Sequence, residues 1–158
     1  MSQPPEMIRR PNTLRTKLGG GFGGIDAAAV ARAEEALKAL SSQFDQWLQD
    51  EITKLDAAEA VIRNEGFTEK AAEGLYLRAH DLKGLGTTYQ YPLVTRIAGS
   101  LCRLMDDPVQ RMKSPWPLIE AHTNAIRAVV RDGIQDENHP VGVELATALE
   151  AEVRALGL

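Results

Sequence analysis

Cysteine is nearly absent from this sequence of 158 residues, which contains one, Cys102. A lone cysteine cannot form an intramolecular disulfide, and no group of cysteines and histidines has the spacing of a metal site. The sequence also lacks a secretory leader and an apolar run of the ~18 residues that a membrane helix needs. We therefore expect a cytoplasmic protein with no bound metal, no structural disulfide and no membrane segment.

Aromatic residues are few, and basic residues do not outnumber acidic ones. Aromatic side chains make up 5% of the sequence, whereas apolar residues make up 44% and charged residues 25%. Alanine and leucine are frequent, and this composition is typical of a soluble protein in which helices pack on helices. The net charge of −4 argues against a nucleic-acid partner, because proteins that bind phosphate backbones concentrate basic side chains on one face.

Residues 1–24 are predicted to form a flexible N-terminal tail. They contain Pro4, Pro5 and Pro11 followed by the run GGGFGG. Such a segment buries too little apolar surface to offset the conformational entropy that is lost when it is ordered. The remaining residues, 25–158, are enough for one hydrophobic core, and we expect a single domain there.

Apolar periodicity predicts five helices in this domain. The first begins at Asp26 and ends near Gly66, and its length leaves room for a break near Ser41 and Ser42. Four shorter helices follow: one over residues 69–89, which Thr68 is placed to cap, one from Pro92 through Met105, one from Ser114 to about Gly133 and one starting at Pro140. No strand pattern competes with them. The short connections favour an up-down four-helix bundle with an additional long N-terminal helix.

The helix predicted over residues 69–89 has an apolar face and an outer face. At 100° per residue, the apolar stripe holds Ala71, Leu75, Ala79, Leu82, Leu85, Gly86 and Tyr89. The outer face holds His80 together with Glu73, Tyr76, Leu77, Lys83, Gly84 and Thr87. We therefore expect the imidazole of His80 to point away from the core.

Two glycines in this helix have different explanations. A glycine inside a helix costs about 1 kcal/mol relative to alanine. Gly86 lies on the apolar stripe, where a missing side chain lets another helix come close. Gly84 lies on the outer face, one turn after His80, so we interpret it as clearance for a partner that must reach the imidazole. Lys83 places a cation at the same point, where it can compensate the charge of a transferred phosphoryl group.

The string AHDLKG, from Ala79 to Gly84, resembles the His-x-x-Lys-Gly signature of histidine-containing phosphotransfer (HPt) domains. These domains are four-helix bundles with an exposed phosphoacceptor histidine. The similarity covers LYLRAHDLKGLGTTYQYPLVTRIAGSLCRLM, about a fifth of the chain. It implies that His80 accepts the phosphoryl group, that Lys83 compensates its charge and that Gly84 clears space for the partner. Many members have glycine ten residues after the histidine, where this chain has Gln90.

The resemblance implies a phosphoryl carrier in a two-component phosphorelay. His80 would take the group from the aspartyl phosphate of a response-regulator receiver domain and pass it to a second receiver, with Mg²⁺ bound by the receiver. A hybrid sensor histidine kinase could supply one of these receivers. The contacts around His80 would be Glu73, Tyr76, Leu77, Gly84 and Thr87. We expect a monomer, although the long first helix leaves pairing between chains open.

The chain has no glycine-rich ATP loop, so we do not expect an enzyme that phosphorylates itself from ATP, nor a cofactor of its own. The alternative function is a helical adaptor that binds a receiver or another protein through the same face without transferring phosphate.

The other histidines and the cysteine have structural interpretations. His122 lies on the apolar stripe of the fourth helix and is predicted to be partly buried, and His139 precedes Pro140 as a loop or cap residue. Neither is followed by a lysine one turn later. Cys102 is predicted to be a small packing residue, since no basic cluster surrounds it.

Overall fold

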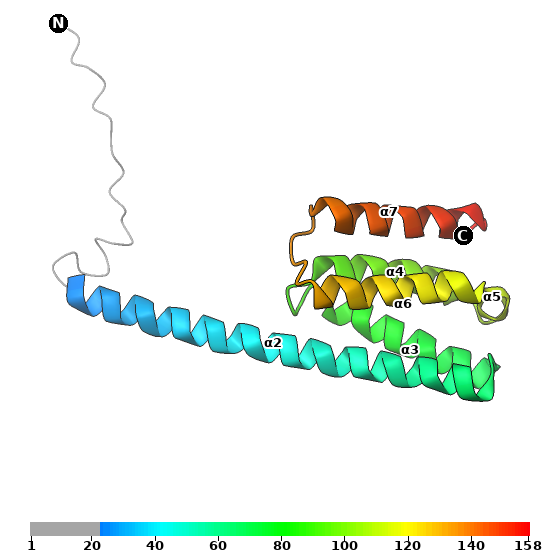
Figure 1. The fold of residues 1–158 in the computed structure, drawn as a ribbon, viewed down its shortest axis with the longest axis horizontal. Coiled ribbons are helices and arrows are strands. Elements are labelled where there is room, and N and C mark those ends of the chain that lie inside the picture. The colour runs from blue at the N-terminus through cyan, green and yellow to red at the C-terminus, as the bar shows by residue number, and fades with distance from the viewer. Residues whose placement is uncertain (1–22) are drawn as a thin grey trace, which may run out of the picture. The chain divides into compact units, whose positions relative to one another are not determined.

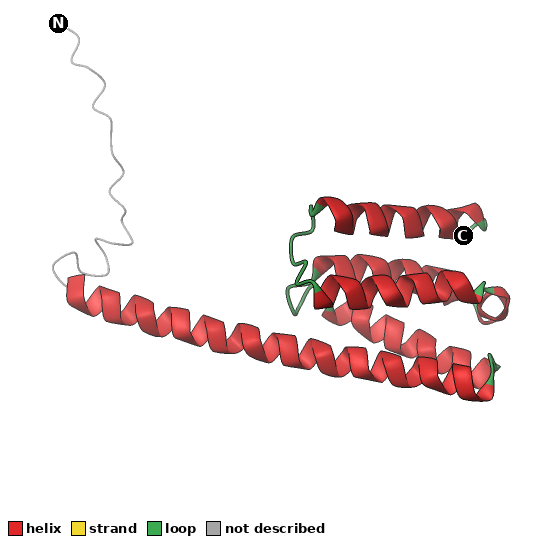
Figure 2. Cartoon of the chain, viewed as in Figure 1, coloured by secondary structure: helices red, strands yellow, loops and turns green. Residues whose placement is uncertain are grey.

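The structure is a computed structural model that describes residues 23–158, with side chains from Asp26 onward. The predicted tail, residues 1–24, lies outside the described residues except for Gly23 and Gly24, which begin the first helix. Residues 23–158 form six helices and no strand (Figures 1 and 2). The helices are α2 (Gly23–Glu65), α3 (Glu69–Leu85), α4 (Pro92–Met105), α5 (Pro108–Lys113), α6 (Trp116–Arg131) and α7 (Pro140–Ala155).

The chain divides into two compact units, and the boundary in the sequence falls within α2, between Ser42 and Gln43. Its backbone stays helical across this point, so the break considered near Ser41 and Ser42 does not interrupt the helix. In the first unit, every side chain from Ala27 to Leu40 is exposed. The second unit, residues 43–158, contains the hydrophobic core.

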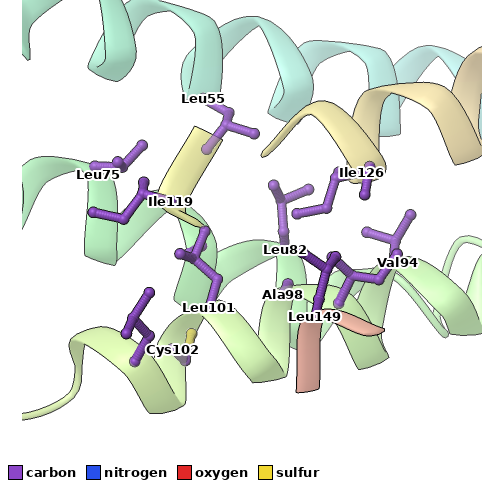
Figure 3. Packing of buried hydrophobic residues seen from close by; sticks show 14 of the residues in the cluster. Leu55, Leu75, Leu82, Val94, Ala98, Leu101, Cys102, Ile119, Ile126 and Leu149 are labelled. Atoms are coloured by element: carbon purple, nitrogen blue, oxygen red, sulfur yellow. The ribbon is translucent and has the colours of Figure 1, made fainter. Parts of the chain in front are cut away.

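The core of the second unit draws on residues 43–65 of α2 and on helices α3, α4, α6 and α7. Helix α4 packs against α3, α6 and α7, and it contributes more buried residues than any other helix. Figure 3 shows side chains from these elements interlocking, among them Leu55, Leu82, Leu101, Ile126 and Leu149. Burying each such side chain stabilises the fold by about 1.5–3 kcal/mol, which fixes the direction in which α3 presents its outer face.

Several predicted helix boundaries are confirmed. Thr68 caps α3, since its hydroxyl accepts a hydrogen bond from the backbone N–H of Ala71 at 3.1 Å. Gly66 and Gly133 follow helix ends with φ angles of +93° and +64°, a region that favours glycine. Prolines occupy the first turn of α4 and α7, where the missing N–H carries no penalty.

Three features differ from the sequence prediction. Helix α2 begins at Gly23, three residues before the predicted start at Asp26. Helix α3 ends at Leu85, and Gly86–Gln90 form turns, so Thr87 and Tyr89 lie beyond the helix. The short helix α5 was not predicted at all. Asp107 begins it, because its carboxylate accepts hydrogen bonds from the N–H groups of Val109 and Gln110 at 2.9 and 2.8 Å.

In the described part of the chain, every helix is too short or too polar to cross a bilayer.

Candidate functional site

Helix α3 holds His80 at the surface because its opposite side is anchored in the core. Ala72, Leu75, Ala79 and Leu82 are completely buried, whereas His80 is exposed. Within the described residues, no hydrogen bond engages the ring of His80. Both imidazole nitrogens are therefore open to a ligand or a partner, as the helical wheel predicted.

Lys83 lies on the same outer side of α3, and its side chain is exposed. The neighbouring charges Arg78 and Asp81 pair with each other at 3.5 Å. Among the side chains that the structure describes, none forms an ion pair with Lys83. Its ammonium is thus available to an anion that approaches His80.

The two glycines of this segment differ as the sequence predicted. A Cβ placed on Gly84 would meet nothing within 4 Å, which leaves open space beside His80. A Cβ on Gly86 would lie 2.5 Å from Thr95 Oγ1, 2.6 Å from Thr95 N and 2.9 Å from Tyr91 O. Gly86 therefore permits the close approach of α4, whereas Gly84 has no packing role.

The turn after α3 is closed by hydrogen bonds to α4. The backbone N–H of Thr87 donates to Thr95 Oγ1 at 2.8 Å, and the Thr87 hydroxyl donates to the same oxygen at 3.1 Å. Gln90 has a φ angle of +69°, which is the left-handed conformation that glycine adopts most easily.

Tyr76 lies one turn before His80, and its ring centroid is 6.2 Å from that of the imidazole. Its hydroxyl donates a 2.6 Å hydrogen bond to Asp106 Oδ1, and this bond is the main reason why the pKa of Tyr76 is raised. The guanidinium of Arg111 lies over the ring, with Cζ 4.5 Å from the centroid. Three elements, α3, α5 and the end of α4, therefore fix the position of the ring next to His80.

Arg111 is the least expected member of this group, because it is a charged residue with only 8% of its surface exposed. Its Nε donates a 2.8 Å hydrogen bond to the carbonyl of Met105 at the end of α4. Sequence reasoning missed both Asp106 and Arg111, since Tyr76 and Asp106 are 30 positions apart and α5 was not predicted. The Asp107–Pro108 pair, a cap residue followed by a first-turn proline, was the signal that could have revealed α5.

The remaining predicted contacts lie on the same helix. Leu77 is 47% exposed, and Glu73 is exposed two turns before His80. Glu73 also lines a groove of about 460 Å³ between the start of α3 and α5, which Glu69, Pro108, Val109, Arg111, Met112 and Lys113 complete. The structure thus brings Glu73, Tyr76 and Leu77 to one side of His80, with Lys83 and Gly84 on the other and Thr87 in the turn beyond.

The other two histidines are engaged in the fold. His122 is fully buried, more deeply than predicted, and its Nδ1 donates to the carbonyl of Leu118 at 2.7 Å. Its Nε2 therefore accepts the 2.9 Å hydrogen bond from the hydroxyl of Ser100. His139 is confirmed as a cap residue, since its Nδ1 accepts from the N–H of Gly142 at 3.4 Å.

Cys102 is a packing residue and not a reactive thiol. It is buried, and burial raises its pKa to about 11, so its nucleophilic thiolate form is rare near neutral pH. In the described part of the chain, no three histidine, cysteine or carboxylate side chains gather where a metal ion could bind.

Comparisons of the chain with protein-family models, with curated proteins and with solved structures gave no significant match.

Proposed function

We propose that this chain is a histidine phosphotransfer protein of a two-component phosphorelay and that His80 carries the phosphoryl group. The observation that supports the proposal most strongly is the state of His80, which is exposed on a helix anchored in the core and is free of hydrogen bonds to the described residues. Lys83 and the bare backbone at Gly84 lie within one turn of it. A phosphoacceptor needs this combination of a free nucleophile, a nearby cation and clearance.

The transfer step uses one ring nitrogen of His80 as the nucleophile. Its electron pair forms the P–N bond while the P–O bond to the receiver's aspartate breaks, and the electron pair of that bond stays on the aspartate carboxylate. The ammonium of Lys83 compensates the charge on the phosphoryl oxygens as they arrive. Mg²⁺ belongs to the receiver in this scheme, and the chain needs neither ATP nor a cofactor of its own.

The helical arrangement is consistent with an HPt-type four-helix bundle. We assign α3, α4, α6 and α7 to that bundle, with α4 in contact with the other three. Helix α2 would then be the additional long N-terminal helix, and its residues from Leu48 to Ile62 pack on the same core.

The docking face for a receiver domain comprises Tyr76, Leu77, Gly84 and Thr87 around His80, with Lys83 at its charged edge and Glu73 at its rim. Leu77 supplies exposed apolar surface, which contributes most to association when it is buried at the centre of an interface. The hydroxyl of Thr87 already bonds to Thr95, so we expect Thr87 to contribute contact area more than a new hydrogen bond.

The decisive experiment exposes purified variants to a phosphorylated receiver and measures labelled phosphate on this chain. The wild type should acquire an acid-labile, base-stable label, and His80→Gln should acquire none while keeping its helical circular-dichroism signal. His139→Asn is the matched control, because asparagine can still cap α7, and it should be labelled like the wild type. Full labelling of His80→Gln would refute the proposal. Binding of a receiver without any label on the wild type would instead identify the chain as an adaptor.

A further inference from the structure

A polar cleft of about 170 Å³ lies between helices α4 and α7, and none of its lining residues belongs to the docking face around His80. The two helices pack against each other (Figure 1), and near the start of both, the side chain of Leu93 fills the space beside Gly142. The charged residues of the cleft are Arg96 and Arg103 of α4 and Glu150 and Arg154 of α7. Three arginines and one carboxylate leave two positive charges uncompensated there, in a chain whose net charge is −4.

One arginine of the cleft is held in place by the fold. The Nη2 of Arg96 donates a 2.6 Å hydrogen bond to Glu150 Oε1 and a 3.2 Å hydrogen bond to Thr147 Oγ1, and its Nε bonds to both oxygens of Glu150 at 3.2 Å. The hydrogen bond from Arg96 is the main reason why the pKa of Glu150 is lowered, and Arg154 has only a smaller, through-space effect on it. Glu150 is therefore engaged by Arg96.

The other two arginines of the cleft have free guanidinium groups. Arg103 and Arg154 are exposed, and within the part of the chain that the structure describes, neither guanidinium forms a hydrogen bond or an ion pair. Arg103 follows Arg96 by two turns of α4, and Arg154 follows Glu150 by one turn of α7. Because the two helices run in the same direction, Arg103 and Arg154 both lie beyond the Arg96–Glu150 pair and on the same side of it.

Gly99 lies between the two arginines of α4 and lines the cleft. A Cβ placed on Gly99 would meet nothing within 4 Å, so packing does not require glycine, although glycine inside a helix costs about 1 kcal/mol relative to alanine. The missing side chain keeps the cleft open at this point. The next residue, Ser100, also lines the cleft, but its hydroxyl donates to His122. Donors for a ligand in the cleft are therefore the guanidinium groups.

We propose that this cleft binds a small phosphorylated molecule, whose phosphate group lies between Arg103 and Arg154. A guanidinium donates two parallel hydrogen bonds to a phosphate group, and two free guanidinium groups from different helices balance its two negative charges. Among the described residues, Val153 is the only apolar side chain in the lining, so charge and not apolar contact selects the ligand. The volume of the cleft is below the roughly 300 Å³ at which sites for drug-sized ligands begin, which favours a compact ligand.

The first test is a titration of the full chain with inorganic phosphate at constant ionic strength, followed by the amide signals of α4 and α7 in two-dimensional NMR spectra. The signals of Gly99, Arg103 and Arg154 should shift and saturate. Arg103→Gln and Arg154→Gln should each weaken the affinity about tenfold, because each removes hydrogen bonds to a charged group. Arg131→Gln is the matched control, since Arg131 is exposed and bonds to Asp132 outside the cleft; it should bind like the wild type.

A second test fills the cleft without changing its charge. Gly99→Leu should weaken the affinity for phosphate at least tenfold and keep the helical circular-dichroism signal, because the added side chain enters open space. Gly74→Leu on α3, where a Cβ would also meet nothing within 4 Å, is the matched control and should leave the affinity unchanged. Wild-type affinity in Gly99→Leu would contradict binding in the cleft.

Three other results would overturn the proposal: shifts in the wild type that rise without saturating, which would indicate only a diffuse ion atmosphere; wild-type affinity in both Arg103→Gln and Arg154→Gln; and weaker binding in Arg131→Gln. His80→Gln should bind phosphate at the cleft like the wild type, so the outcome is distinct from that of the phosphotransfer experiment. Glycerol 3-phosphate should compete with inorganic phosphate. Capture of the chain by vesicles containing phosphatidic acid, with no response to glycerol 3-phosphate, would refute a small soluble ligand.

Discussion

The hydroxyl of Tyr76 donates a 2.6 Å hydrogen bond to Oδ1 of Asp106, and this bond joins the helix that carries His80 to the end of α4. Arg111 covers the same ring and is itself bonded to the carbonyl of Met105. The aromatic neighbour of the candidate phosphoacceptor is therefore held from two sides, by partners that lie close together in sequence but far from α3.

Tyr76→Phe should lower the free energy of unfolding by about 0.5–1 kcal/mol, since it removes one hydrogen bond and keeps the ring. Asp106→Asn should lower the free energy of unfolding less than Tyr76→Phe does, because the amide oxygen of asparagine can still accept the hydrogen bond from the Tyr76 hydroxyl. Urea unfolding of the two variants and the wild type measures both effects. Equal stability of Tyr76→Phe and the wild type would show that the bond contributes nothing in solution.

Substitutions of the two glycines should act in opposite ways. Gly84→Gln should raise the stability of the fold by roughly 0.5–1 kcal/mol through helix propensity, and it should slow phosphotransfer because a side chain then occupies the docking face. Gly86→Ala should lower stability by about 1–3 kcal/mol, because its Cβ would meet the backbone of α4 at 2.6 Å. Unfolding curves and transfer kinetics test the pair. Unchanged transfer in Gly84→Gln would contradict the clearance role.

Lys83→Ala should slow phosphotransfer and leave the stability of the fold almost unchanged. Lys83 is exposed, so we expect its removal to change stability by no more than about 0.5 kcal/mol. Transfer to His80 should become slower, because the cation near the phosphoryl oxygens is lost, and Lys83→Arg should restore part of the rate. If Lys83→Ala transfers at the wild-type rate, Lys83 is an ordinary surface residue.

The buried imidazole of His122 should make the fold sensitive to acid. Burial lowers the pKa of His122 from its usual 6.5, and the hydrogen bond to Leu118 opposes that shift in part. Below pH 6.5 the unfolded chain binds a proton that the folded chain does not, so the free energy of unfolding falls as the pH falls towards the folded pKa. The part of the folding stability that depends on a neutral His122 is therefore fully present above pH 6.5 and is lost on acidification.

His122→Gln should lack this dependence on pH and should be less stable at neutral pH by about 1–3 kcal/mol, since Ser100 loses a fitted partner. His139→Asn, which changes an imidazole near the surface, should keep the wild-type dependence. Urea unfolding at a series of pH values measures both. The same slope in His122→Gln as in the wild type would assign the acid sensitivity to other groups.

Gln90→Gly should stabilise the fold. A side chain at a φ of +69° costs about 1–2 kcal/mol relative to the usual backbone conformations, and the added flexibility of glycine in the unfolded chain offsets part of that gain. Gln90→Ala retains the strained backbone and is the matched control. Thermal unfolding should therefore place Gln90→Gly above both the wild type and Gln90→Ala, and a lower melting temperature for Gln90→Gly would contradict the strain.

The sequence could predict the features that depend on residues close together along the chain. The buried stripe of α3, the Thr68 cap and the difference between Gly84 and Gly86 all follow from periodicity and backbone preference. It could not predict that Tyr76 reaches Asp106 or that Arg111 is buried over the ring, because these contacts join segments whose approach depends on tertiary packing. The end of α3 was misplaced for the same reason. Residues 86–89 continue the apolar pattern, but their bonds to Tyr91 and Thr95 close a turn instead.

Helix α3 contains glycine at positions 74 and 84, neither of which has a neighbour within 4 Å of a Cβ placed there, and Gly86 caps its end. Each internal glycine weakens an isolated helix by about 1 kcal/mol relative to alanine, and 17 residues are few for a helix in water. A synthetic peptide of residues 69–90 should therefore be mostly unstructured. The arrangement of His80, Lys83 and Gly84 is a property of the folded chain, and the motif grafted as a short tag onto another protein would not reproduce it.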